Sequence, residues 1–118
     1  MTTILIIDDH APFRATARLL LEADGFAVVG EAADGASGLA AARTLRPDII
    51  LLDIGLPDME GFDVAHELSG DALPAGVVLT SSREAEAYGP RLIGSPVLGF
   101  ICKDELSGPA IRTLAGLP

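Results

Sequence analysis

The sequence contains a single cysteine, Cys102, so no disulfide can form within the chain. A lone cysteine is typical of proteins from a reducing compartment, and we expect Cys102 to be a small buried side chain. Basic residues are also scarce, because 8 Lys and Arg stand against 17 Asp and Glu, giving a formal net charge of −9. Phosphate contacts need clustered Lys or Arg, so this composition argues against direct nucleic-acid binding by the chain.

Long apolar runs are absent as well. The N-terminal stretch has no charged leader region and its apolar residues end at Asp8, which argues against a signal peptide or a membrane anchor. No run approaches the roughly 20 residues that a membrane-spanning helix needs. We therefore expect a cytoplasmic protein. The 118 residues, of which 49% are apolar and 21% charged, are typical of one globular domain covering residues 1–118.

Strand-like and helix-like segments alternate along the whole chain. The predicted strands cover residues 3–7, 26–32, 48–53, 76–80 and 97–102. The predicted helices cover residues 11–24, 34–46, 61–68, 83–88 and 107–116. Such alternation predicts an α/β fold with a parallel sheet covered by helices on both faces. The polar end of the second strand, at Gly30 and Glu31, indicates an edge position for that strand.

Helical spacing predicts which side chains face the sheet. In the first helix these are Phe13, Ala17, Leu20 and Leu21, in the second Leu39, Ala42 and Leu45, and in the last Ala110, Ile111 and Leu114. Asp34 and Ser107 are expected to cap the second and last helices. Gly25 and Gly116 are expected just past helix ends. The Gly89-Pro90 pair is expected to break the fourth helix and shorten it.

Carboxylates follow two of the buried strands. Asp8 and Asp9 come directly after the first strand, and Asp53 closes the third. Parallel strands end at the same edge of a sheet, where ligands of such folds bind, so we expect the three acids to cluster. Two charges about 4 Å apart repel by about 4 kcal/mol near a protein surface, so the cluster needs a cation. Oxygen ligands favour Mg²⁺, whereas neither His10 nor His66 has the spacing of a zinc ligand.

These residues stand within segments that resemble the receiver domain of bacterial two-component response regulators. The resemblance covers essentially the whole chain and is specific because its motifs occur in order, each acid or cation at a strand end. The matching segments are residues 6–10, 30–35, 46–53, 56–61, 77–81 and 99–103. The resemblance implies a flavodoxin-like three-layer sandwich with a five-stranded parallel sheet of order 2-1-3-4-5 and five helices.

The resemblance also implies a role for each residue at the sheet edge. Asp53 would accept a phosphoryl group from a phosphohistidine of a sensor histidine kinase. Asp8 and Asp9, with Asp53 and the backbone carbonyl of Gly55, would hold Mg²⁺. Two further residues would contact the phosphoryl group: Lys103 as a counter-charge and Thr80 through its hydroxyl.

A switch would follow from the same contacts. Movement of Thr80 towards the phosphoryl group would open space that Phe100 can fill, which couples the site to the surface. Phe100 lacks the hydroxyl of the tyrosine often found at its position. The resemblance implies a phosphorylation-activated switch rather than a turnover enzyme. It would act alone on a protein target, or as part of a longer transcriptional regulator with its own output domain.

Other interpretations are open at the level of sequence. The same acids could serve a Mg²⁺-dependent phosphatase or phosphotransferase, although such enzymes usually place a general acid two positions after the nucleophile, where this chain has Gly55. A nucleotide-binding domain is disfavoured because the loop from Asp8 to Phe13 has no glycine. Homodimerisation, if it occurs, is expected through the face formed by the fourth helix, fifth strand and fifth helix. The irregular fourth helix places the usual dimer mode in doubt.

Overall fold

The computed structural model describes residues 1–83 and 87–118. One parallel sheet forms its centre, with strands β1 (Thr3–Ile7), β2 (Ala27–Ala32), β3 (Ile49–Asp53), β4 (Gly76–Ser81) and β5 (Gly99–Cys102). The strand order is β2-β1-β3-β4-β5, as the resemblance implied, and β2 lies at the expected edge. In the described part of the chain, five α-helices connect or follow the strands: α1 (Ala11–Ala23), α2 (Gly35–Leu45), α3 (Gly61–Gly70), α4 (Pro90–Ile93) and α5 (Gly108–Ala115).

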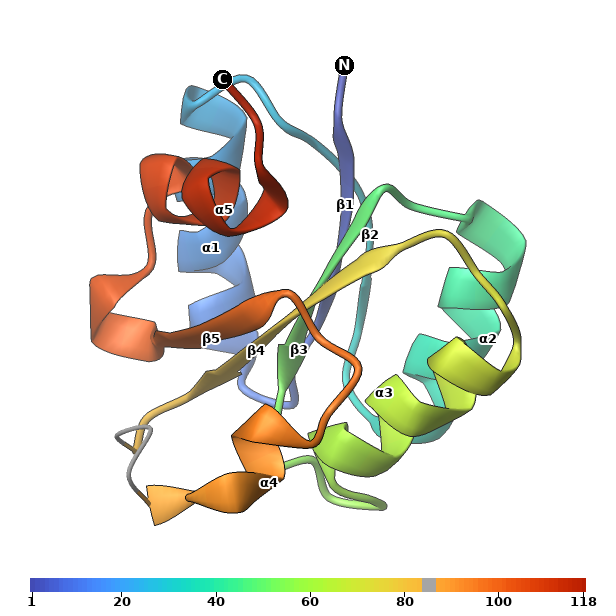
Figure 1. The fold of residues 1–118 in the computed structure, drawn as a ribbon. Coiled ribbons are helices and arrows are strands. Elements are labelled where there is room, and N and C mark those ends of the chain that lie inside the picture. The colour runs from blue at the N-terminus through green and yellow to red at the C-terminus, as the bar shows by residue number, and fades with distance from the viewer. Residues whose placement is uncertain (84–86) are drawn as a thin grey trace.

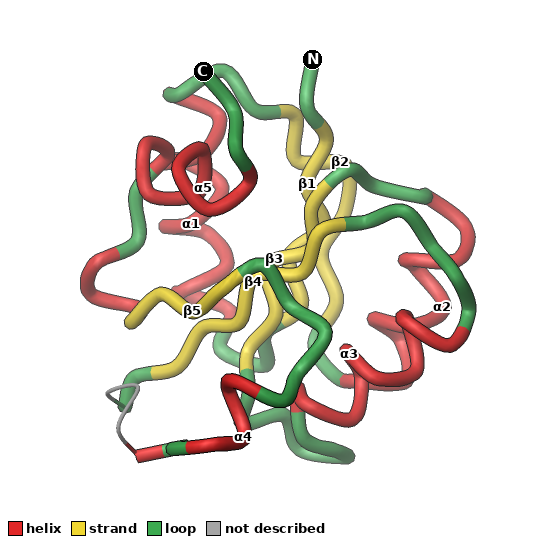
Figure 2. Tube along the Cα trace, in the orientation of Figure 1, coloured by secondary structure: helices red, strands yellow, loops and turns green. Residues whose placement is uncertain are grey.

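The helices form a layer on each side of the sheet (Figure 1). Helices α1 and α5 cover one face, while α2, α3 and the short α4 cover the other. Both chain termini lie at the end of the sheet opposite to α4. The loops that follow the carboxyl ends of the strands lie at the other end of the sheet, near α4 (Figure 2). This is the flavodoxin-like three-layer sandwich.

The sheet is buried on both faces because its central strands are apolar throughout. On β1, Leu5 and Ile7 belong to the core under α2 and α3, whereas Ile4 and Ile6 belong to the core under α1 and α5. All five residues of β3 are buried, including the terminal Asp53. Continuous apolar runs are expected of parallel strands that are covered by helices on both sides. The covered sheet holds the strand ends, and therefore the acids, in fixed positions.

The four predicted residues at helix ends are confirmed. The Asp34 side chain accepts a hydrogen bond from Ser37 N at 2.8 Å, and Ser107 Oγ accepts one from Ala110 N at 3.1 Å. Gly25 and Gly116 follow α1 and α5 with φ angles of 91° and 69°, a region that glycine enters without steric cost. These caps terminate the helices that frame the sheet.

The prediction that Leu20 and Leu45 face the sheet is wrong. Leu20 and Leu45 are each 42% exposed. In α1 the buried stripe is narrow and consists of Ala17 and Leu21, so Leu20 falls outside it. Leu45 ends α2 beside Gly30 of the edge strand, where no further strand can cover it.

The fourth helix also departs from the sequence prediction. Residues 84–86 of the predicted helix 83–88 lie outside the described residues. Residue 87 is in 3-10 conformation, and residues 88–89 form a turn. The Gly89-Pro90 pair does not end a helix but begins α4, with proline in the first turn, where its missing N–H costs nothing. Strand β5 begins at Gly99 instead of residue 97, although Leu98 N already donates to Val77 O at 2.7 Å. Among the described residues, no helix has the length and apolarity needed to cross a bilayer.

Candidate functional site

The three predicted acids meet at the carboxyl edge of the sheet. Strands β1 and β3 are neighbours, and Ile7 pairs with Leu52, so Asp8 and Asp53 leave adjacent strands side by side. Carboxylate oxygens of Asp8, Asp9 and Asp53 all lie within 4.8 Å of one another. Asp8 is 1% exposed and Asp53 6%, whereas Asp9 is exposed to solvent. The site is therefore a pair of buried carboxylates with a third at its mouth.

Lys103 supplies a positive charge to this cluster. It follows β5 directly, in a single 3-10 turn over Lys103–Glu105, and is the only lysine in the chain. Its Nζ lies 2.7 Å from Asp8 Oδ2 and 3.5 Å from Asp53 Oδ2. The ammonium also lies 4.6 Å from the ring centroid of Phe13, a cation–π contact that keeps it over the acids.

Asp53 carries an unusually basic carboxylate. Burial raises its pKa above the ordinary aspartate value, and the neighbouring charge of Asp8 adds to that effect. Lys103 and the N–H of Gly55, which donates to Asp53 Oδ1 at 3.3 Å, act in the opposite direction but do not cancel it. A carboxylate that is buried and incompletely compensated gains from a nearby cation.

The donor set fits a hard divalent cation. Three carboxylates face one ammonium, which leaves an excess of negative charge in a partly dry site. Mg²⁺ takes oxygen ligands, commonly one or two carboxylates together with waters. Asp8, Asp9 and Asp53 offer such oxygens within 4.8 Å of one another, and Lys103 pairs with two of the three acids.

Thr80 and Phe100 lie on the next two strands. Thr80 pairs in register with Asp53 and with Ile101, and its backbone carbonyl accepts from Ile54 N at 3.0 Å. Its hydroxyl is buried and has no hydrogen-bond partner within the described residues. Phe100 pairs with Leu79, one position from Thr80, and is half-buried against the core under α2 and α3. A buried hydroxyl without a partner is unusual and is free to bind an incoming oxygen atom.

The acids open into a solvent-accessible cavity of about 420 Å³. Asp53, Gly55 and Lys103 line it, and its lining also includes residues that the sequence did not indicate: His10, Glu60, Ser81, Arg83 and Tyr88. Tyr88 is the only tyrosine of the chain and stands directly before the Gly89-Pro90 pair. That position is the one sequence feature that could have indicated its role in the cavity wall. The cavity has room for a small group beside the Asp53 carboxylate.

The loop after β3 is anchored by two contacts that the sequence did not reveal. The Asp58 carboxylate accepts hydrogen bonds from Gly35 N at 2.7 Å and Ala36 N at 2.9 Å, so it caps α2 from another loop. These bonds hold the pKa of Asp58 below its ordinary value. Gly61 N donates to Ile54 O at 2.8 Å, and a Cβ at Gly61 would lie 2.5 Å from the carbonyl oxygen of Asp53. Both contacts fix the path of the chain on leaving Asp53.

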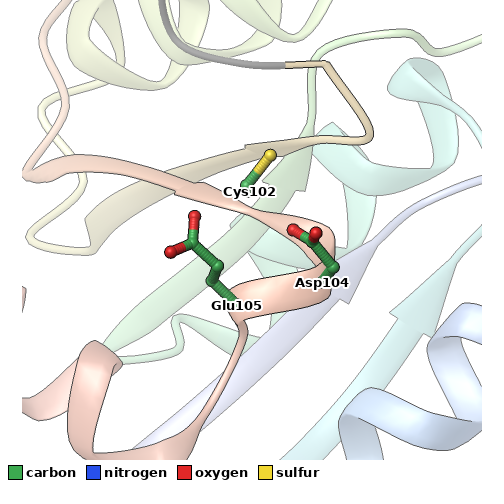
Figure 3. A group of neighbouring side chains, drawn as sticks. All are labelled: Cys102, Asp104 and Glu105. Atoms are coloured by element: carbon green, nitrogen blue, oxygen red, sulfur yellow. The ribbon is translucent and has the colours of Figure 1, made fainter.

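A second group of ligand-type side chains lies at the end of β5 and in the turn that follows it (Figure 3). Atoms of Cys102, Asp104 and Glu105 come within 4.8 Å of one another. Cys102 is buried, as predicted, and its thiol donates to the carbonyl of Arg83 at 3.3 Å, whereas both acids are exposed. The thiol is thus engaged by the fold, and solvated acids need no metal.

The fold and this site together define a class of protein, and comparison with known proteins agrees. The family model of the response regulator receiver domain matches residues 4–112. The chain is 39% identical over 105 residues to a transcriptional regulator of Pseudomonas aeruginosa, covering 89% of this chain and 51% of the relative. It is 38% identical over 102 residues to the virulence-factor transcription regulator BvgA of Bordetella pertussis, covering 86% and 49% respectively.

Solved structures give the same result. The signal receiver domain of NarL from Mycobacterium tuberculosis superposes with a TM-score of 0.90 at 32% identity, covering 98% of this chain and 96% of that one. The chain belongs to the receiver domains of two-component response regulators, whose general function is that of a phosphorylation switch. It spans about half the length of the curated relatives it matches. Receiver domains are generally not enzymes, although one relative from Anaeromyxobacter dehalogenans is a protein-glutamate methylesterase of which this chain covers 31%.

Proposed function

We propose that Asp53 is the residue that accepts the phosphoryl group. A carboxylate oxygen of Asp53 attacks phosphorus in line, an oxygen–phosphorus bond forms, and the phosphorus–nitrogen bond to the donor imidazole breaks. The observation that carries this proposal is the position of Asp53, which is buried, lines an open cavity, and lies beside Lys103 and Asp8. Its raised pKa supports the same role, since higher basicity accompanies stronger nucleophilicity.

The neighbouring residues stabilise the group as it transfers. Lys103 pairs with the phosphoryl oxygens, and the free hydroxyl of Thr80 donates to one of them. Asp8, Asp9 and Asp53, whose carboxylates cluster, would hold Mg²⁺ together with the carbonyl of Gly55. When bound, the metal ion offsets the negative charge of the nucleophile and of the phosphoryl oxygens. Thr80 and Phe100 then carry the change outward as the switch.

The donor in this proposal is a phosphohistidine of a sensor histidine kinase, and the setting is cytoplasmic. Several relatives are named transcription regulators and are about twice as long as this chain. We therefore propose that the output passes either to a separate protein target or to an output domain of a longer regulator. Direct nucleic-acid binding by residues 1–118 is not part of this function, because 17 acids outnumber 8 basic residues.

The test is phosphorylation by a small phosphodonor. Parent protein and Asp53→Asn are incubated with acetyl phosphate and Mg²⁺, and intact mass is recorded. The parent is expected to gain one phosphoryl group and the variant none, while the exposed-acid control Asp104→Asn gains it like the parent. A phosphoryl group retained by Asp53→Asn would move the acceptor to another residue. Multiple turnovers of a phosphoester would favour the phosphatase alternative instead.

A further inference from the structure

Tyr88 joins the cavity wall to the segment that leads into α4. It lies in the turn before α4, half-buried, and lines the same cavity as Asp53 and Lys103. Its hydroxyl lies 2.5 Å from Ser81 Oγ, a short hydrogen bond. Ser81 is buried, ends β4, and directly follows Thr80. A single hydrogen bond thus ties the α4 segment to the residue next to the proposed phosphoryl contact.

The ring of Tyr88 also occupies the space beside Phe100. Its centroid lies 6.0 Å from that of Phe100 and 5.8 Å from that of Phe62, with interplanar angles of 54° and 64°. Contacts of this kind between aromatic rings add to the free energy gained by burial. Phe100 therefore packs against Tyr88, and a change in the position of either ring requires a change in the other.

The backbone changes direction directly after Tyr88, at Gly89. Gly89 has φ 55° and ψ −133°, a conformation that residues with a side chain rarely adopt. Beyond it, Arg91 of α4 forms an ion pair with Glu60 at 2.7 Å and stacks over the Phe62 ring at 4.2 Å. Exposed ion pairs contribute little to stability, so the buried end of this arrangement, Tyr88 and Ser81, is the stronger attachment of the segment.

We propose that Tyr88 is a positioning residue that couples the phosphoryl site to α4. In the unphosphorylated protein its hydroxyl holds Ser81, and its ring keeps Phe100 in place. When the hydroxyl of Thr80 turns to a phosphoryl oxygen, the end of β4 moves with it, and the hydrogen bond between Ser81 and Tyr88 is lost. Tyr88 leaves the wall and α4 is released. Phe100 has no hydroxyl, so the hydroxyl of Tyr88 is the one whose hydrogen bond differs between the unphosphorylated and the phosphorylated protein. This inference rests on the proposed function.

The chain carries its own probe for this event. Tyr88 is the only tyrosine and there is no tryptophan, so intrinsic fluorescence reports on Tyr88 alone. Addition of acetyl phosphate and Mg²⁺ to the parent is expected to change the tyrosine emission at the rate at which intact mass shows phosphorylation. Asp53→Asn is expected to show no change. If the parent gains the phosphoryl group while its tyrosine emission stays constant, the coupling is wrong and the proposed function stands. If no phosphoryl group is gained, both fail.

Two variants test the hydrogen bond itself. Tyr88→Phe keeps the ring and removes the hydroxyl. Ser81→Ala removes the partner, together with the hydrogen bond that Ser81 Oγ accepts from Arg83 N at 3.0 Å. Each variant is expected to react with acetyl phosphate about fivefold faster than the parent, because the unphosphorylated state loses the free energy of one ordinary hydrogen bond. The double variant is expected to be no faster than Ser81→Ala alone, because that substitution already removes the bond to Tyr88.

The matched control is Ser95→Ala. Ser95 Oγ donates to Arg91 O at 2.6 Å at the far end of α4, away from the cavity. Its loss is expected to leave the phosphorylation rate unchanged. A purely structural role for Tyr88 would lower the melting temperature of Tyr88→Phe without accelerating phosphorylation, and that result would overturn the proposal. So would acceleration of equal size in Ser95→Ala.

Discussion

The ammonium of Lys103 lies closer to Asp8, at 2.7 Å, than to Asp53, at 3.5 Å. In the unphosphorylated protein the lysine therefore pairs mainly with a carboxylate that is proposed to bind metal, and compensates the proposed acceptor less well. This unequal sharing is consistent with the raised pKa of Asp53. Binding of a cation by the acids would free Lys103 to meet a phosphoryl group.

Lys103→Ala tests the role of this counter-charge. Without Mg²⁺ the variant is expected to lose about 3 kcal/mol of unfolding free energy, because two buried carboxylates lose their ammonium. Mg²⁺ is expected to restore most of that loss, and Lys103→Arg to lose less than the alanine variant. Denaturant unfolding with and without Mg²⁺ provides the measurement. Phosphorylation at Asp53 should persist in part while the tyrosine emission change weakens, and a fully parental response would contradict the role of Lys103.

Magnesium binding is expected to depend on the acids at the sheet edge. At a Mg²⁺ concentration ten times Kd, the parent should gain about 1.4 kcal/mol of stability from ligand binding. Asp8→Asn and Asp9→Asn should lose this gain, whereas Asp104→Asn, from the group past β5, should keep it. Calorimetric titration and thermal melting measure the two effects. Equal loss in Asp104→Asn would place the metal at the other group.

Two glycines of α3 are expected to respond to the same substitution with opposite signs. Gly61→Ala places a Cβ 2.5 Å from the carbonyl oxygen of Asp53, a backbone atom that cannot move aside freely, and should cost about 2 kcal/mol. Gly70→Ala meets no atom within 4 Å and should stabilise the protein by about 0.5–1 kcal/mol through its higher helix propensity. Denaturant unfolding compares them. Similar values for the two variants would show that the close approach beside Asp53 is unimportant.

Asp58 is expected to make stability depend on pH at the acidic end. Its pKa is lowered from 3.8 by the N–H groups of Gly35 and Ala36, so its contribution is fully present above that ordinary value. The contribution is lost as pH falls through the lower native pKa. Asp58→Asn should therefore melt at a lower temperature than the parent at neutral pH, and the difference should shrink on acidification. A difference that is independent of pH would show that the charge of Asp58 is not what holds α2.

The sequence alone predicted the alternating α/β architecture and which acids meet at the edge of the sheet. Apolar runs such as residues 49–53 identify strands buried on both faces, because no polar alternation marks a solvent side. Acids placed directly after the first and third strands had to meet, since parallel strands end at one edge. The caps at Asp34 and Ser107 were readable because capping depends on neighbours only a few residues away.

Only the tertiary structure decided how wide each buried helix face is and which distant residues touch. Helical spacing could not show that Leu20 lies outside the narrow stripe of α1, because that depends on how closely the helix packs against the sheet. The cap from Asp58 to Gly35, the contact of Tyr88 with Ser81, and the preference of Lys103 for Asp8 join separate loops. Such contacts are set by the paths of the connections between strands, and no local pattern in a sequence encodes those paths.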